Sequence, residues 1–311
     1  MPDHAPSNQL AVDQPTRGAD RNQSLAEQAN PGTDKMLLPS LSAGITLLDI
    51  EGDRGVHSLH SLVLDHLLRH EGPAFWVDAN GHATTTTLAR IAPSQRLLDR
   101  IHVARGFTAY QHYAAVDELP TAVNQSIKDA TATTGPGGRQ STSPDDSSSP
   151  YTPSLIVVPA VDARYRDDDT LAAEHAKTLQ ARTLARLATY ADGYDVPVLV
   201  TRSTVEEFTA PVATAADHQL RCEQTRLGPR FIGEDFETLV YPVDDGAYYQ
   251  TTLAYWRQVL DARASQVGLE PATPSSPSST SVDVGTGKTA NGKTASLTAR
   301  PLLDAWTAGG Q

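Results

Sequence analysis

The sequence predicts an α/β fold of three layers, in which helices cover both faces of a mostly parallel central sheet. Short apolar runs recur along the chain, and most are followed by a stretch whose apolar residues have helical spacing. Strands that alternate with helices in this way form parallel sheets. The runs are mostly apolar, which is typical of strands that are buried on both faces.

The first strand and helix are the part around which the rest is organised. Residues 45–50 (ITLLDI) predict a buried strand, residues 51–55 (EGDRG) a glycine-bearing turn, and the following residues a helix that ends near Arg69. A strand, a glycine turn and a helix in this order are the layout of a phosphate-binding loop.

The chemistry of such a loop is missing from this stretch. A loop of the GxxxxGK[ST] type needs a Lys for the β- and γ-phosphates, but no Lys occurs between Met36 and Ile127. Glu51 and Asp53 would repel a polyphosphate. We therefore expect a nucleotide-binding architecture that has lost its nucleotide site.

The remaining elements continue the alternation. Further strands are predicted at residues 74–78, 101–105, 154–158 and 196–201, and further helices at 86–91, 94–100, 109–127 with a break near Pro120, 171–190 and 253–266. Residues 218–223 and 237–243 are expected to form antiparallel strands at one edge of the sheet.

Three polar segments set the limits of the folded core. We expect a disordered N-terminal tail over residues 1–35, a core over 36–266 and a disordered C-terminal tail over 267–311, because both tails are polar and lack periodicity. Residues from about 129 to 153 are mostly Thr, Ser, Gly, Pro and Asp and predict a disordered insertion in the core. About 200 ordered residues remain, which fits one domain.

The charge of the chain is acidic. A formal net charge of −12 argues against a generalised nucleic-acid-binding surface, although it leaves room for a local basic patch. Only five of the 25 basic residues are Lys. This balance resembles that of proteins from salt-accumulating halophiles.

The single Cys222 excludes an internal disulfide and a metal site built from cysteines. The sequence starts with a polar stretch, and no apolar run is long enough to span a bilayer. We expect a soluble cytoplasmic protein without membrane contact.

Five segments resemble, in their order, the ATPase core of archaeal RecA/RadA-type recombinases. They are ITLLDIEG, FWVDANG, IHVARGFTAYQH, LIVVPAVDARYR and LAAEHAKTLQARTLARLATYADGYDVPVLVT. The resemblance covers roughly Met36 to Val243 without the insertion, and it implies a RecA-like, P-loop-type domain. The small helical DNA-binding domain that precedes the core in full-length recombinases has no counterpart here.

The resemblance also implies which positions carried the nucleotide chemistry. The P-loop Lys and the hydroxyl after it fall near Val56 and His57, or near Ser58 and Leu59 with a different gap. The degenerate nucleotide site then comprises Gly52, Asp53, Arg54, Gly55, Val56, His57, Asn80 and Pro159.

The family's catalytic Glu corresponds to Asn80, whose amide cannot act as a general base. The Asp near magnesium corresponds to Pro159, and the polar residue that senses the γ-phosphate corresponds to Arg202 or Ser203. The family's P-loop Lys, catalytic Glu and magnesium-site Asp are therefore all substituted in this sequence. Neither ATP nor magnesium is an expected cofactor.

Two loops hold DNA in this family. The first corresponds to residues 164–169 and the second to residues 203–217, where Glu206 and Glu207 stand without a basic residue. Phosphate contacts need Lys, Arg or backbone donors, so DNA binding by this route is expected to be weak or indirect. The residues left for DNA contact are Arg164, Tyr165, Arg166 and Arg202.

Other patterns have simpler interpretations beside the functional ones. Residues 287–294 match GxxxxGK[ST] literally, but in a polar tail. His66 and His70 share a helix face and are interpreted either as metal ligands or as surface or partly buried histidines. Residues 167–169 are interpreted either as magnesium ligands or as an acidic turn at the start of a helix. Residues 302–306 are interpreted either as a linear motif that docks on a partner or as a frayed chain end.

The resemblance implies a non-catalytic RecA/RadA-like paralogue, a pseudo-ATPase that acts as an accessory or regulatory factor in DNA recombination or repair. Its expected partner is a RadA-type recombinase or another repair protein, in a homo- or hetero-oligomer. One alternative is a nucleotide-binding switch whose remodelled loop, residues 51–57, holds phosphates with backbone amides and Arg54. Another is a regulatory scaffold unrelated to DNA.

Overall fold

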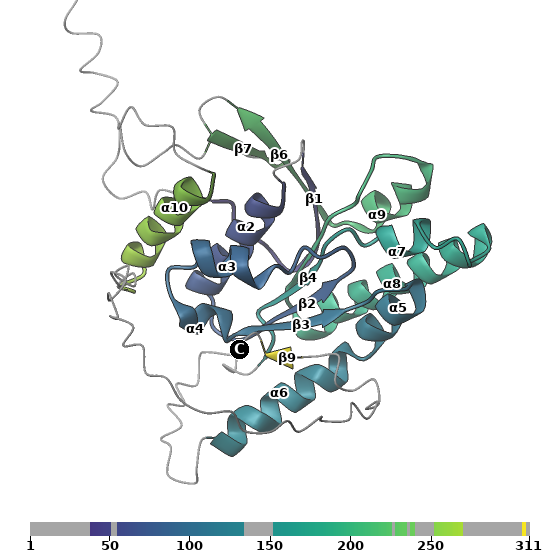
Figure 1. The fold of residues 1–311 in the computed structure, drawn as a ribbon, viewed down its shortest axis with the longest axis horizontal. Helices are drawn as coiled ribbons and strands as arrows, with labels where there is room; N and C mark the ends of the chain where they lie inside the picture. The colour runs from purple at the N-terminus through teal and green to yellow at the C-terminus, as the bar shows by residue number, and fades with distance from the viewer. Residues whose placement is uncertain are drawn as a thin grey trace, which may run out of the picture. The chain divides into compact units, whose positions relative to one another are not determined.

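The computed structural model describes residues 38–50, 55–133, 152–225, 228–234, 237–239, 252–269 and 307–308. Within these residues nine strands form one sheet in the order β8-β7-β6-β1-β5-β4-β2-β3-β9 (Figure 1). The strands are β1 (Gly44–Ile50), β2 (Ala74–Asp78), β3 (Ile101–Arg105), β4 (Leu155–Val158), β5 (Pro197–Val200), β6 (His218–Thr225), β7 (Gly228–Ile232), β8 (Glu237–Leu239) and β9 (Thr307–Ala308).

The helices follow the strands as the alternation predicts. They are α2 (Gly55–Arg69), α3 (Thr85–Ile91), α4 (Gln95–Leu98), α5 (Ala109–Asp117), α6 (Leu119–Thr133), α7 (Ala163–Arg166), α8 (Ala173–Tyr194), α9 (Ala210–Ala215) and α10 (Thr252–Gln266), with a short 3-10 helix η1 (Glu207–Thr209) before α9. No helix in the described ranges is long and apolar enough to cross a bilayer.

The adjacent strands from β6 to β3 all run parallel. Antiparallel strands flank them, with β7 and β8 beyond β6 and with β9 beyond β3. The predicted α/β fold with a mostly parallel sheet is therefore confirmed.

Side chains of the central strands alternate between two apolar clusters, one on each face of the sheet. On β2, Trp76 belongs to one cluster, and Phe75 and Val77 belong to the other. The first cluster packs the sheet against α2, α3, α4 and α10, and the second packs it against α5, α6, α8 and α9. Burial on both faces explains why these strands are continuous apolar runs in the sequence.

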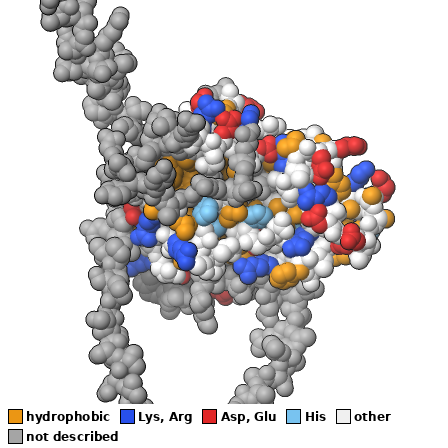
Figure 2. Space-filling view, turned by 45° about the horizontal axis from the view of Figure 1, so that its top comes forward, with side chains coloured by type: hydrophobic (Ala, Val, Ile, Leu, Met, Phe, Trp, Pro, Cys, Tyr) orange, Lys and Arg blue, Asp and Glu red, His pale blue; other side chains and the backbone are white. Residues whose placement is uncertain are grey.

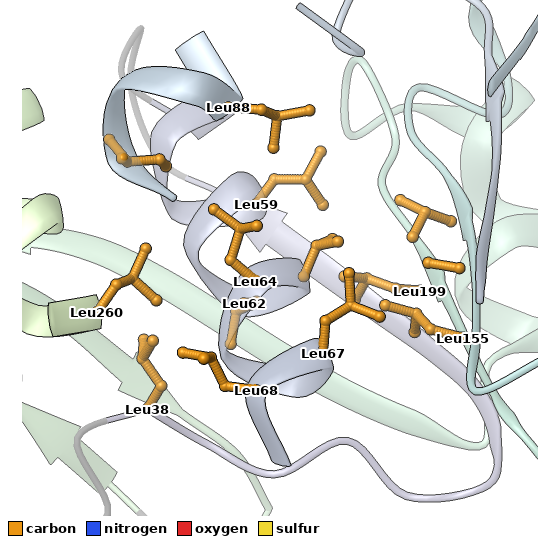
Figure 3. Packing of buried hydrophobic residues seen from close by; sticks show 14 of the residues in the cluster. Leu38, Leu59, Leu62, Leu64, Leu67, Leu68, Leu88, Leu155, Leu199 and Leu260 are labelled. Atoms are coloured by element: carbon orange, nitrogen blue, oxygen red, sulfur yellow. The ribbon is translucent and has the colours of Figure 1, made fainter. Parts of the chain in front are cut away.

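Helix α2 lies at the centre of the first cluster. Its residues 58–68 are all buried. Figure 3 shows α2 between Leu155 and Leu199 of the sheet on one side and Leu260 of α10 on the other. Burying one such leucine contributes about 1.5–3 kcal/mol, so this packing fixes α2 firmly beside the end of β1.

Three features of the structure differ from the expected layout. Strand β6 is parallel to β1, and its antiparallel partner is the unpredicted β7. The region predicted as insertion from residue 129 begins inside α6, which continues to Thr133. Part of the predicted tail forms β9, which pairs with β3. The rest of both tails and residues 134–151 lie outside the described residues, as do the motifs at 287–294 and 302–306.

Candidate functional site

The strand order leaves a crevice at the carboxyl ends of the central strands. β2 and β4 are neighbours, but the chain leaves β2 towards α3 on one face of the sheet and leaves β4 towards α8 on the other. β1 and β5 are also neighbours, and they lead to α2 and α9 on opposite faces. Ligands of open α/β sheets bind where neighbouring connections diverge in this way.

A pocket of about 280 Å³ lies at this crevice. Its walls come from β1, from the beginning of α2 and from the residues that follow β2, β4 and β5. The lining residues are Leu48, Ile50, Val56, Leu59, Asn80, His82, Ala160, Thr201, Arg202 and Ser203. The β1 and α2 side is apolar, whereas the residues after β2 and β5 are mainly polar.

Arg202, which lines the pocket, is bound to a carboxylate of the neighbouring strand. Arg202 Nε donates to Asp49 Oδ1 at 2.8 Å, and a terminal nitrogen of Arg202 donates to Asp49 Oδ2 at 2.6 Å. The Arg202 side chain is only 12% exposed. Two parallel bonds are the strong form of this pair, so a phosphate at Arg202 would compete with Asp49.

The carboxylate at the end of β2 is also fully engaged. Asp78 is buried and accepts bonds from the backbone N–H groups of Asn80, His82 and Ala83 at 3.3, 2.9 and 3.2 Å. Arg105 Nε lies 3.6 Å from Asp78 Oδ2. Asp78 therefore holds the turn after β2 and is not free to activate a water molecule.

The residues after β4 and β5 are bound to each other. Pro159 is buried, and Ala160 after it has a φ of 48°. Ala160 N–H donates to Thr201 Oγ1 at 2.8 Å, and Ser203 N–H donates to the buried Asp162 at 2.8 Å. Burial raises the pKa of the Asp162 carboxyl, although its hydrogen bond with Ser203 opposes this effect.

The structure brings together some of the residues that were predicted to form a degenerate nucleotide site. Val56 and Asn80 line the pocket, and Pro159 directly precedes the lining residue at the end of β4. Gly55 and His57 belong to the first turn of α2. The other predicted positions, Gly52, Asp53 and Arg54, lie outside the described residues.

Tyr165 cannot stack on a nucleic-acid base in this structure, because its side chain is buried. It is 1% exposed, and its hydroxyl lies 2.6 Å from Thr183 Oγ1 and 2.8 Å from His112 Nδ1. Burial raises the pKa of the Tyr165 hydroxyl. A DNA contact through the Tyr165 ring would require the side chain to leave this buried position.

The predicted DNA-contact arginines have partners within the protein. Arg164 Nε donates to the Ala79 carbonyl, and Arg202 is paired as described above. Arg166 contacts three carboxylates: Asp162, which precedes the first loop, Asp167 within the first loop and Glu206 in the second loop. On the face shown in Figure 2, basic side chains are spread with acidic ones among them and do not form one basic stripe.

Two buried histidines, His60 and His66, lie along α2. His60 Nε2 lies 2.6 Å from the His82 carbonyl, and burial lowers the pKa of His60 to about 4. His66 Nε2 lies 2.8 Å from the Ser154 carbonyl, and burial lowers the pKa of His66 to about 3. The rings of His66 and His70 stack 4.2 Å apart. Over the described ranges, no group of three potential metal ligands gathers.

Sequence reasoning missed the three carboxylates that hold the crevice, Asp49, Asp78 and Asp162. Each stands near the carboxyl end of a predicted strand, and that position was the available signal. Their roles depend on which strands are neighbours, and the sequence does not show this.

Comparison with known proteins leaves the site to be interpreted from its own geometry. No family model matches the chain, and no curated protein matches it.

Proposed function

We propose that this protein is a non-catalytic RecA/RadA-like factor that assists or regulates DNA recombination or repair. The observation that carries the proposal is the composition of the pocket. Among the described residues that line it there is no Lys and no carboxylate, and the arginine among them, Arg202, is paired with Asp49. On this proposal the chain keeps a nucleotide-type crevice, while other residues replace the groups that bind phosphate and magnesium.

The same residues explain why hydrolysis is not expected. A general base must reach the attacking water with a free basic group. At the position that the resemblance assigns to the catalytic Glu, the pocket has Asn80. Magnesium prefers oxygen ligands, usually including carboxylates, and the buried Pro159 supplies no side-chain oxygen. Asp78, the nearest acid at the end of β2, is saturated with backbone donors.

A role through a protein partner fits the charges better than a role through DNA. Arg166 and Arg202 already contact carboxylates, so a DNA phosphate would have to displace Asp162 or Asp49. We therefore expect the factor to act on a RadA-type recombinase or another repair protein and to contact DNA weakly.

The first test is ATP turnover by the purified protein with magnesium in high-salt buffer. The wild type is expected to release phosphate no faster than the Arg202→Ala variant. The exposed Arg90 of α3 provides a matched control. Turnover that is present in the wild type and in Arg90→Ala but lost in Arg202→Ala would overturn the proposal.

The second candidate is a nucleotide-binding switch, and the position of Arg202 favours it. Arg202 and the start of α2 share the pocket, and helix N-termini bind phosphates even without Lys. Saturable, magnesium-dependent ATP binding without turnover would support this candidate, provided that Arg202→Ala abolishes binding and Arg90→Ala does not.

The partner is tested with a purified RadA-type recombinase and single-stranded DNA. The proposal expects a complex between the two proteins and a changed rate of strand exchange. If the protein neither binds the recombinase nor changes the rate, its role in recombination is excluded for that partner.

A further inference from the structure

The outer side of β3 is an edge of the parallel sheet. All five residues of β3 pair with β2 on the inner side. On the outer side, within the described residues, pairs are formed by His102 with Ala308 and by Val103 with Thr307. Unlike the fully buried β2, β4 and β5, strand β3 has partly exposed and exposed residues.

An open edge of this kind needs protection, because its free N–H and C=O groups pair readily with another strand. Strand β3 reads IHVAR and contains no Pro and no Gly. Ile101 and Val103 have high strand propensity, and Arg105 is its one charged residue. Phe107, two residues after the end of the strand, is 69% exposed. The residues of β3 alone therefore give little defence against edge pairing.

We propose that the outer edge of β3 is a strand-docking site and that residues 307–308 of the same chain cover it. Figure 1 shows β9 beside β3 at this end of the sheet. The intervening residues 270–306 are numerous enough to reach from α10 to β3, because each adds up to about 3.3–3.6 Å. A tethered segment meets its site at an effective concentration that reaches the millimolar range, so the chain's own segment is favoured over a second copy.

The inference does not rest on the proposed function. It makes β9 a removable cover: when residues 307–308 leave, the outward-facing N–H and C=O groups of β3 in the stretch that pairs with β9 become available to another extended peptide. Backbone pairing of this kind gives affinity for a strand, and side-chain pockets give specificity.

The test is hydrogen exchange of the full chain and a variant with proline at both β9 positions, Thr307→Pro with Ala308→Pro. Proline cannot donate to a ladder, and replacing both positions removes the donor whichever residue supplies it. A matched control exists in the same chain, because Thr289–Ala290 is also a Thr-Ala pair. The control variant is Thr289→Pro with Ala290→Pro.

Peptides that cover residues 101–106 are expected to exchange faster in the β9 variant, by about tenfold or more at the amides that face outwards. The amides that face β2 should not change, and the control variant should match the wild type. Equal exchange in all three proteins would overturn the proposal.

Dilution separates the chain's own segment from that of a second copy. Protection by the same chain is independent of protein concentration, whereas protection that falls on dilution would assign the site to a second copy and overturn the covering role. A chain that stops after Ala299 should expose the edge, and a synthetic peptide of residues 300–311 should restore protection. Failure of the peptide to restore it at millimolar concentration would also count against the site.

Discussion

At the residue scale, Ala160 is the clearest sign of strain in the candidate site. Its φ of 48° lies in the left-handed region, and within the described residues Asp195 is the other non-glycine residue there. A side chain with a Cβ costs roughly 1–2 kcal/mol in this conformation. The bond from Ala160 N–H to Thr201 Oγ1 holds the backbone in place between β4 and β5.

Replacing Ala160 with glycine is therefore expected to stabilise the protein by up to about 1 kcal/mol. The substitution relieves the backbone strain, and the greater conformational entropy of the unfolded chain offsets part of this gain. Ala185 is exposed within α8 and gives the opposite control. Ala185→Gly should cost about 0.5–1 kcal/mol. Urea unfolding measures both. A loss of stability in Ala160→Gly as large as that in the control would show that Ala160 is not strained.

The residues of the pocket were predicted only in part. The resemblance implied Val56, Asn80 and Arg202 or Ser203 as site positions, and in the structure all four line one pocket. The pairing of Arg202 with Asp49 was not predictable, because the two residues are 153 positions apart. Only the adjacency of β1 and β5 brings them together, and apolar patterning does not encode adjacency.

At the element scale, α2 is joined to α10 by a buried ion pair. Arg263 Nε donates to Asp65 Oδ1 at 2.8 Å, and the two side chains are 3% and 0% exposed. Arg69 lies 2.9 Å from the other oxygen of Asp65. Burial raises the pKa of Asp65, and the two arginines oppose this effect.

Asp65→Ala leaves the Arg263 guanidinium buried without this carboxylate, which typically costs about 3–5 kcal/mol. The exposed pair of Lys177 and Glu174 on α8 is the control, and Lys177→Ala should change stability by less than about 1 kcal/mol. The midpoint of urea unfolding reports both changes. Similar small losses in the two variants would mean that the buried pair contributes no more than a surface pair.

The central elements were predictable and the edges were not. β2, β4 and β5 are buried on both faces, so each is a continuous apolar run. β6 buries only Leu220 and Cys222 between exposed residues, and this alternation looks like an antiparallel edge. β9 is a Thr-Ala pair with no periodicity, so no pattern could distinguish it from the polar residues before it.

At the scale of the whole molecule, buried histidines make the fold sensitive to acid. Burial lowers the pKa values of His60, His66 and His112 to about 4, 3 and 4 from an ordinary value of 6.5. Between these values and 6.5 the unfolded chain binds protons that the folded chain excludes, so stability falls as the pH falls. The raised pKa values of Asp65 and Asp162 act in the opposite sense.

Replacing His112 with Asn isolates one of these contributions. From pH 6.5 down to about pH 4, each excluded proton lowers the free energy of unfolding by up to about 1.4 kcal/mol per pH unit. In His112→Asn the free energy of unfolding should therefore fall less steeply as the pH is lowered. The control His175→Asn, at an exposed position on α8, should keep the slope of the wild type. Urea unfolding at pH 7, 6 and 5 gives the slopes. Parallel slopes for wild type and His112→Asn would contradict the assignment.

The position of β1 in the sheet has a consequence for the newborn chain. Its two neighbours are β5 and β6, whose paired residues begin at Pro197 and His218. At a synthesis rate of about 5–20 residues per second, the ribosome needs roughly 8–30 s to make the intervening chain of about 150 residues. During that interval β1 has emerged with both edges unpaired. The apolar core of this fold is thus assembled late in translation, and the first strand made is among the last to be enclosed.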